Sequence, residues 1–122
     1  LESIAYQADD VIRAMEKSAD IKLSGLKVDG GASANEFLMQ FQSDITGESV
    51  IRPSCIETTA LGAAYLAGLA TGYWKDKEEI KKNWRLGAEY DAHMSPDERR
   101  KLLKNWKHAV NSALFWAEAA EK

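Results

Sequence analysis

The sequence predicts a helix-rich α/β fold with a short parallel strand–helix–strand unit and a long C-terminal helix. Two short apolar segments, residues 26–28 and 48–52, flank a segment with helical periodicity, and a second long periodic segment follows residue 95. A parallel strand pair joined by a helix needs helices on the faces of its sheet, which defines the α/β class. Because two strands alone make a poor sheet, the unit is expected to belong to a larger one.

The first segment is predicted to be an amphipathic helix. Its apolar residues recur at spacings of three and four, namely Leu1, Ile4, Ala5, Ala8, Val11, Ile12 and Met15. No N-cap residue precedes Leu1, and the chain does not begin with Met. We therefore expect this helix to continue from upstream sequence.

A pair of glycines, Gly30 and Gly31, separates the first strand from the next helix. Backbone N–H groups at a helix start are unpaired and lie at the positive end of the helix dipole, and glycine lets an anion approach the main chain. This junction suits a phosphate, but a plain turn is supported equally, since many turns use paired glycines. Asp29 either orients a ligand hydroxyl or water, or only ends the strand, and the sequence favours neither.

The helix after the glycines is predicted to begin with a capping box and to end at Gly47. In a capping box the Ser33 hydroxyl accepts a hydrogen bond from the Glu36 N–H, and the Glu36 carboxylate accepts one from the Ser33 N–H. The expected buried stripe consists of Phe37, Leu38, Phe41 and Ile45.

A third helix is expected from Thr58 to about Gly72, and its residues are unusually small. Gly62 and Gly68 lower helix propensity, which predicts a close approach to a neighbouring sheet or ligand. Residues 76–79 cap a short charged helix, and residues 85–92 are predicted to be an extended connection.

Residues 95–98, Ser-Pro-Asp-Glu, combine an N-cap, a proline at the first helical position and an early glutamate, so a long helix should start there. One face is apolar and is expected to pack back on the domain: Leu102, Leu103, Trp106, Val110, Ala113, Leu114 and Ala117. Its basic residues are interpreted as a solvated face.

Composition limits the function classes. The formal charge is −3 without a clustered basic face, which argues against nucleic acid or an anionic membrane as the main partner. Cys55 cannot form an internal disulfide and is expected to be buried, in keeping with a reducing cytoplasm. His93 and His108 have no partners at ligand spacings, so no metal site and no catalytic residue are predicted. The four tryptophans are expected in the core.

Two runs carry a family resemblance. Residues 28–45, VDGGASANEFLMQFQSDI, and residues 57–70, ETTALGAAYLAGLA, closely resemble the C-terminal part of the glycerol kinase family, one of the FGGY carbohydrate kinases in the actin/hexokinase-like ATPase superfamily. Residues 4–7 and 106–110 resemble its flanking helices, whereas residues 85–100 match least. The run at 57–65 favours this family over other sugar kinases.

The resemblance implies a partial ribonuclease-H-like domain. Residues 1–122 would be one domain, the C-terminal nucleotide-side part of the second kinase domain, with the first domain and the start of the second absent. By similarity Gly30, Gly31 and Ala32 lie against the adenosine and α-phosphate of ATP, and Asn35 makes an amide contact. The implied cofactors are ATP and Mg²⁺. The family keeps its catalytic aspartate and glycerol-binding residues upstream, so this chain supplies no catalytic and no metal-binding residue.

The implied reaction transfers the γ-phosphoryl group of ATP to a terminal hydroxyl of glycerol, giving sn-glycerol 3-phosphate. The parent protein would be cytoplasmic and able to form homo-oligomers, and residues 1–122 alone would be inactive. Three alternatives stay open: another FGGY sugar or polyol kinase, a non-catalytic nucleotide-binding module, and an interaction module in which the glycines only make a turn. Under the kinase interpretation, Gly31→Val should weaken nucleotide binding.

Overall fold

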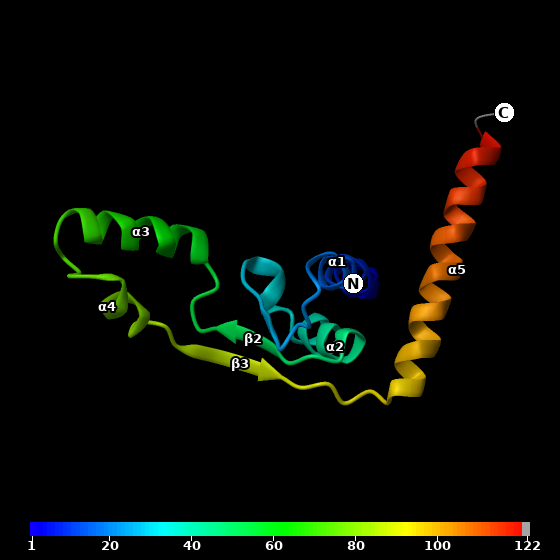
Figure 1. The fold of residues 1–122 in the computed structure, drawn as a ribbon, viewed down its shortest axis with the longest axis horizontal. Helices are drawn as coiled ribbons and strands as arrows, with labels where there is room; N and C mark the ends of the chain where they lie inside the picture. Colours follow the sequence, from blue (N-terminus) through cyan, green and yellow to red (C-terminus); the bar gives the residue numbers. More distant parts are fainter. Residues whose placement is uncertain (121–122) are drawn as a thin grey trace.

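A computed structural model describes residues 1–120. The elements in chain order are α1 (Glu2–Ala19), β1 (Leu26–Lys27), the 3₁₀ turn η1 (Gly31–Ala34), α2 (Glu36–Thr46), β2 (Val50–Pro53), α3 (Thr58–Ala70), α4 (Lys77–Lys81), β3 (Leu86–Tyr90) and α5 (Pro96–Ala120). The molecule is elongated: α1 and α2 lie beside the strands at its centre, α3 and α4 form one end, and α5 rises from the other (Figure 1).

The three strands form one mixed sheet in the order β1-β2-β3. β1 and β2 are parallel, with Leu26 opposite Val50, so the predicted strand–helix–strand unit and the α/β class are confirmed. β3 pairs antiparallel with β2, although an extended connection was expected there. A Cβ on Gly87 would lie 2.6 Å from the Pro53 carbonyl oxygen, so glycine permits the close approach of β3 to β2 beside the register shift at Arg52/Pro53.

The core lies between α1, α2 and β2. Its buried apolar residues are Ala5, Tyr6, Leu38, Met39, Ile45 and Val50. The predicted stripe of α2 is wrong at Phe37, which is 54% exposed and stacks on Phe41 at the helix surface. The predicted apolar face of α1 is also largely uncovered, since Ile4, Val11 and Met15 are exposed. The reason is that α1 packs on α2 along one narrow strip, through Ala5, Tyr6 and Asp9.

Only the first half of α5 packs on the body. Trp106 stacks on Tyr6 with ring centroids 5.3 Å apart and donates a hydrogen bond from Nε1 to Asp10 Oδ2 at 2.8 Å. Residues 111–120 are all exposed, so the predicted apolar clasp is wrong at Ala113, Leu114 and Ala117. The expectation of a core position is wrong for Trp116. A helix of 25 residues is about 37 Å long, which exceeds the surface that α1 and α2 offer.

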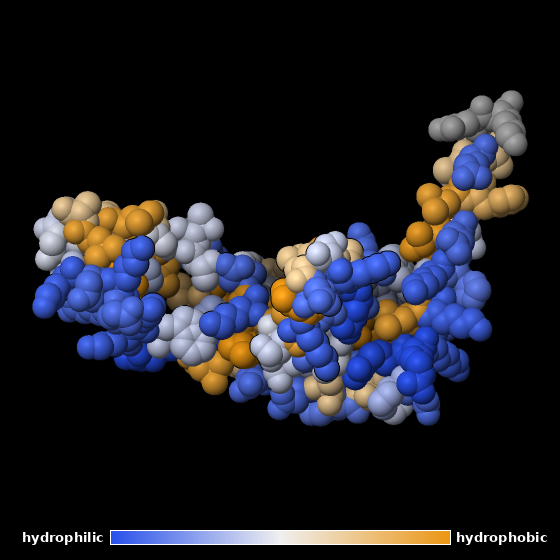
Figure 2. All heavy atoms as spheres, in the orientation of Figure 1, coloured by the Kyte–Doolittle hydropathy of each residue, from blue (hydrophilic) through white to orange (hydrophobic). Residues whose placement is uncertain are grey.

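The helix α3 begins at Thr58 as predicted, ends at Ala70 rather than at Gly72, and buries no residue. Nothing lies within 4 Å of a Cβ built on Gly62, so the expected close approach does not occur there, whereas the ring of Trp74 packs against Gly68. Figure 2 shows the resulting apolar surfaces over α3 and along the outer half of α5. Cys55 and Trp84 are exposed, contrary to the predicted burial of both.

Two arginines from different helices bind the C-terminal carbonyl groups of α2. Arg13 Nη2 of α1 donates to Thr46 O at 2.5 Å, and Arg99 Nε of α5 donates to Asp44 O at 2.7 Å. The helix ends at Gly47 in the left-handed conformation, as predicted, and the Arg99 guanidinium lies against that glycine. Cations at a helix C-terminus are favoured by the helix dipole.

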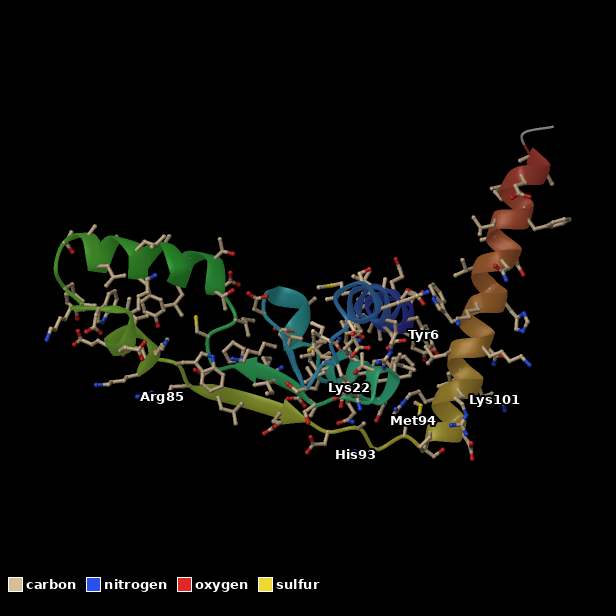
Figure 3. All side chains as sticks on the ribbon, in the orientation of Figure 1. Tyr6, Lys22, Arg85, His93, Met94 and Lys101 are labelled. Atoms are coloured by element: carbon tan, nitrogen blue, oxygen red, sulfur yellow. The ribbon has the colours of Figure 1, made fainter. Side chains whose placement is uncertain are left out.

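The Asp44 side chain anchors the segment that enters α5. Its Oδ1 accepts hydrogen bonds from the backbone N–H of His93 at 2.7 Å and of Met94 at 3.0 Å. Both residues lie on the connection between β3 and α5 (Figure 3). At the start of α5, Ser95 Oγ accepts from the Glu98 N–H at 3.2 Å, which confirms the predicted helix start.

None of the helices within residues 1–120 is apolar over a sufficient length to cross a membrane.

Asp9 is an acid buried between α1 and α2. It is 3% exposed, and its Oδ1 lies 3.2 Å from Arg13 Nε but has no hydrogen-bond partner within residues 1–120. Burial raises the pKa of this carboxyl group, and Arg13 opposes that effect. The neighbouring Glu16 has a lowered pKa because Oε1 accepts from the Leu23 N–H and Oε2 from Arg13.

We expect Asp9→Asn to increase the unfolding free energy more at about pH 7 than at about pH 4. Because the folded-state pKa is raised, the cost of the buried carboxylate is present above that pKa and disappears as the pH falls towards the ordinary value of 3.8. Urea unfolding of both proteins at the two pH values measures this, and the Glu16 contribution cancels in the difference. An equal difference in unfolding free energy between variant and wild type at both pH values would contradict the prediction.

Candidate functional site

The predicted ligand-binding turn lies where the parallel strands β1 and β2 end. Carboxyl ends of parallel strands meet at the same sheet edge, which is the usual ligand side of an open α/β sheet. The Gly30 N–H donates to Ile56 O at 2.8 Å, which joins the segments that follow β1 and β2. The Thr58 hydroxyl donates to the Asp29 carboxylate, which joins the end of β1 to the start of α3. Asp29 thus has a structural partner.

The turn itself is fixed by Gly30 and Ser33. Gly30 has φ 77° and ψ 170°, a backbone conformation that is essentially restricted to glycine. Its carbonyl oxygen accepts hydrogen bonds from the Ser33 N–H at 3.0 Å and the Ser33 hydroxyl at 2.7 Å. Ser33 is 2% exposed, so its side chain points into the turn.

The predicted capping box is wrong. The Ser33 hydroxyl donates to Gly30 O, and residues 31–34 form a 3₁₀ turn, so the α-helix begins only at Glu36. Asn35 is the N-cap instead, with Oδ1 accepting from the Leu38 N–H at 2.9 Å. Asparagine is among the best N-cap residues, which was the overlooked signal. Capping occupies Oδ1 and leaves the Nδ2 amide group of Asn35 as a donor.

The outer surface of the turn is open. Nothing lies within 4 Å of a Cβ built on Gly30 or Gly31, and Gly31, Ala32 and Asn35 are exposed. The four predicted residues therefore lie together on one exposed turn. The first internal bond runs from the Ser33 N–H, so the N–H groups of Gly31 and Ala32 are free of intraturn partners.

A side chain that the sequence did not single out lies behind the turn. Arg52 of β2 donates from Nη1 to Ser33 O at 2.7 Å. The same arginine lines an open hollow of about 410 Å³ together with Ala34, Pro53, Ser54, Ile56 and Gly87. The available signal was a charged residue two positions after the buried Val50, on the same face of β2.

A second cavity, of about 230 Å³, includes Asp29 in its lining. It is lined by Lys27, Val28, Asp29, Ile51, Pro53, Thr58 and Trp84. Lys27 Nζ lies 5.8 Å from the Trp84 ring centroid. Neither cavity is lined by Gly30, Gly31, Ala32 or Asn35, which meet open space instead. In the part of the chain that the structure describes, no three His, Cys, Asp or Glu side chains are grouped so as to hold a metal ion.

Comparisons with known proteins identify the family of the chain. Residues 1–71 match the family described as the FGGY family of carbohydrate kinases, C-terminal domain. The glycerol kinase of Lachnoclostridium phytofermentans is 61% identical over 121 residues, covering 99% of this chain and 24% of that protein. The glycerol kinase of a Thermoanaerobacter species is 61% identical over 118 residues, covering 97% of this chain and 24% of that protein. The chain thus spans about a quarter of the length of these curated relatives.

Solved structures match as well. The crystal structure of Plasmodium falciparum glycerol kinase with ADP has a TM-score of 0.78 and 33% sequence identity, covering 91% of this chain and 22% of that chain. Xylulose kinase from Lactobacillus acidophilus has a TM-score of 0.69 and 22% identity over 91% of this chain and 23% of that chain, a likeness of fold alone. The family match covers residues 1–71, which are more than half of this chain. The chain therefore belongs to the FGGY family of carbohydrate kinases, within their C-terminal domain.

Proposed function

We propose that the protein carrying this chain is a glycerol kinase, which transfers the γ-phosphoryl group of ATP to a terminal hydroxyl of glycerol and forms sn-glycerol 3-phosphate. The observation that carries the proposal is the 61% identity to glycerol kinases over nearly the whole chain. The structural comparisons point the same way, because identity is 33% to a glycerol kinase but 22% to a xylulose kinase and 21% to a gluconate kinase.

Within that enzyme, residues 1–122 are proposed to be the nucleotide-side part of the second kinase domain. The backbone of Gly30, Gly31 and Ala32 would form a wall against the adenosine and α-phosphate of ATP, with the Asn35 amide as a further contact. Three features support this assignment: the turn lies at the carboxyl edge of the parallel strands, its outer face is open, and two of its N–H groups lack intraturn partners.

The bond-making groups would come from outside this chain. ATP supplies the phosphoryl group, and Mg²⁺ neutralises its charge during transfer. Mg²⁺ usually binds through substrate phosphates and one or two carboxylates, and we propose that the nucleotide phosphates and other residues of the parent protein hold it. We therefore expect residues 1–122 alone to have no kinase activity.

The test is a substrate panel for the parent protein. We expect ATP-dependent ADP formation with glycerol, and rates with xylulose and gluconate at least tenfold lower, measured by a coupled assay at saturating ATP. A higher rate with xylulose or gluconate would assign the protein to another sugar kinase. ATP binding without turnover of any polyol would favour a nucleotide-binding module, and absence of ATP binding would favour an interaction module.

A further inference from the structure

We propose that Arg52 is a positioning residue, which holds the glycine turn in the conformation that meets the nucleotide. The inference rests on the proposed function, because it assumes that the turn binds ATP. Arg52 lies on β2 and behind the turn, so it is not placed among the groups that touch the ligand.

The argument starts from a chain of hydrogen bonds. Arg52 Nη1 donates to Ser33 O at 2.7 Å, and the Ser33 hydroxyl and N–H both donate to Gly30 O, at 2.7 and 3.0 Å. The guanidinium on the sheet is thereby connected through one buried serine to the glycine whose backbone faces the ligand. Hydrogen bonds from a charged donor are roughly twice as strong as those between neutral groups.

The turn itself offers few apolar side chains for packing, because residues 30–34 are Gly-Gly-Ala-Ser-Ala. Ala34, Pro53, Ile56 and Gly87 line an open hollow of about 410 Å³, and Arg52, which also lines it, donates a hydrogen bond to the turn. Gly30 adds freedom, because glycine restricts the backbone less than any other residue. Directional hydrogen bonds therefore decide which conformation the turn occupies.

Arg52 is itself held in place by β3. Its Cζ lies 5.6 Å from the centroid of the Tyr90 ring, a cation–π distance. Within the described residues 1–120 Arg52 forms no ion pair, so a carboxylate does not draw the guanidinium away from the turn. The Tyr90 hydroxyl is buried and has no hydrogen-bond partner in the same residues, which leaves the ring as the part of Tyr90 that acts on Arg52.

We expect Arg52→Gln to raise the dissociation constant of ATP and of ADP about tenfold, equivalent to about 1.4 kcal/mol. The physical reason is that the apparent dissociation constant rises as the fraction of molecules with a competent turn falls. The KM for ATP should rise likewise, whereas the KM for glycerol and the melting temperature should change little. Arg52→Lys keeps a cationic donor and should recover part of the affinity. Tyr90→Phe keeps the ring and should bind ATP as the wild type does.

The experiment uses the full-length parent protein, with calorimetric titration of ATP and ADP, steady-state kinetics in both substrates and thermal unfolding. Unchanged ATP affinity in Arg52→Gln would overturn the inference, as would an equal rise in both KM values with a lower melting temperature. A wild type that binds no ATP would overturn the proposed function and this inference with it. If Arg52→Gln does not fold, Ser33→Ala removes the next bond in the chain. Weaker ATP binding by that variant supports the inference, and unchanged binding overturns it.

Discussion

Replacing Gly30 with alanine is expected to weaken ATP binding by the parent protein about ten- to a hundredfold. A residue with a Cβ is strained at the Gly30 backbone angles, φ 77° and ψ 170°, by about 1–3 kcal/mol. The turn would relax away from these angles, and the Gly30 carbonyl would lose its two bonds from Ser33. Calorimetric titration with ATP measures the loss.

Gly31 provides the matched comparison. Its φ is outside the left-handed region, and a Cβ there meets nothing within 4 Å, so adding a Cβ at this position strains neither the backbone nor the packing. Gly31→Val should leave the unfolding free energy unchanged and weaken ATP binding only because its methyl groups occupy the space of the ligand. Wild-type ATP affinity in both the Gly30 and the Gly31 variants would show that the glycines make only a turn.

Replacing Asp44 with alanine is expected to lower the unfolding free energy by about 2–4 kcal/mol. The Asp44 carboxylate accepts the His93 and Met94 N–H groups, and these bonds fix the entry into α5. Without them the two donors lose their partner, and the packing of Trp106 on Tyr6 is weakened. Urea unfolding measures the stability, and limited proteolysis between residues 91 and 95 reports the release of α5.

Asp44→Asn is the control for this prediction. An asparagine keeps one side-chain oxygen as an acceptor at the same place but removes the charge. It should lose less than half as much stability as the alanine variant. Equal losses in the two variants would mean that charge, rather than the hydrogen bonds to His93 and Met94, holds the connection.

Local chemistry predicted the elements whose ends are set by a few neighbouring residues. The serine and proline at 95–96 start α5, Gly47 ends α2, and the strand–helix–strand unit follows from its own pattern. β3 was missed because its sequence, Leu-Gly-Ala-Glu-Tyr, has no β-branched residue. This segment forms a strand because it pairs with the free edge of β2, and strand formation depends strongly on such non-local pairing.

Burial was predicted less well than secondary structure. Periodicity identifies an apolar face but does not say which neighbour covers it. Phe37 and Trp116 illustrate the difference, since each lies on a helix that forms as predicted and each is exposed. The position of Cys55 depends likewise on how the loop after β2 runs, which its residue type does not specify.

The four predicted site residues lie together on one turn, but the internal hydrogen bonds predicted for that turn were wrong. Ser33 and Asn35 are both good N-cap residues two positions apart, and the sequence does not reveal that a 3₁₀ turn inserts between the glycines and α2. Arg52 was overlooked because its partner Ser33 is 19 residues away. Their contact can be predicted only when the parallel register of β1 and β2 is known.

The two ends of helix α2 make different contacts. Its first residue follows the glycine turn, and its last carbonyl groups receive Arg13 and Arg99 from the two flanking helices. With 11 residues it is about 16 Å long, and one inserted residue would rotate one end by about 100° relative to the other. Either Asn35 would no longer cap beside the turn, or both arginines would miss their carbonyl groups. The number of residues in α2 is thus constrained by the contacts at both of its ends, independently of which side chains it carries.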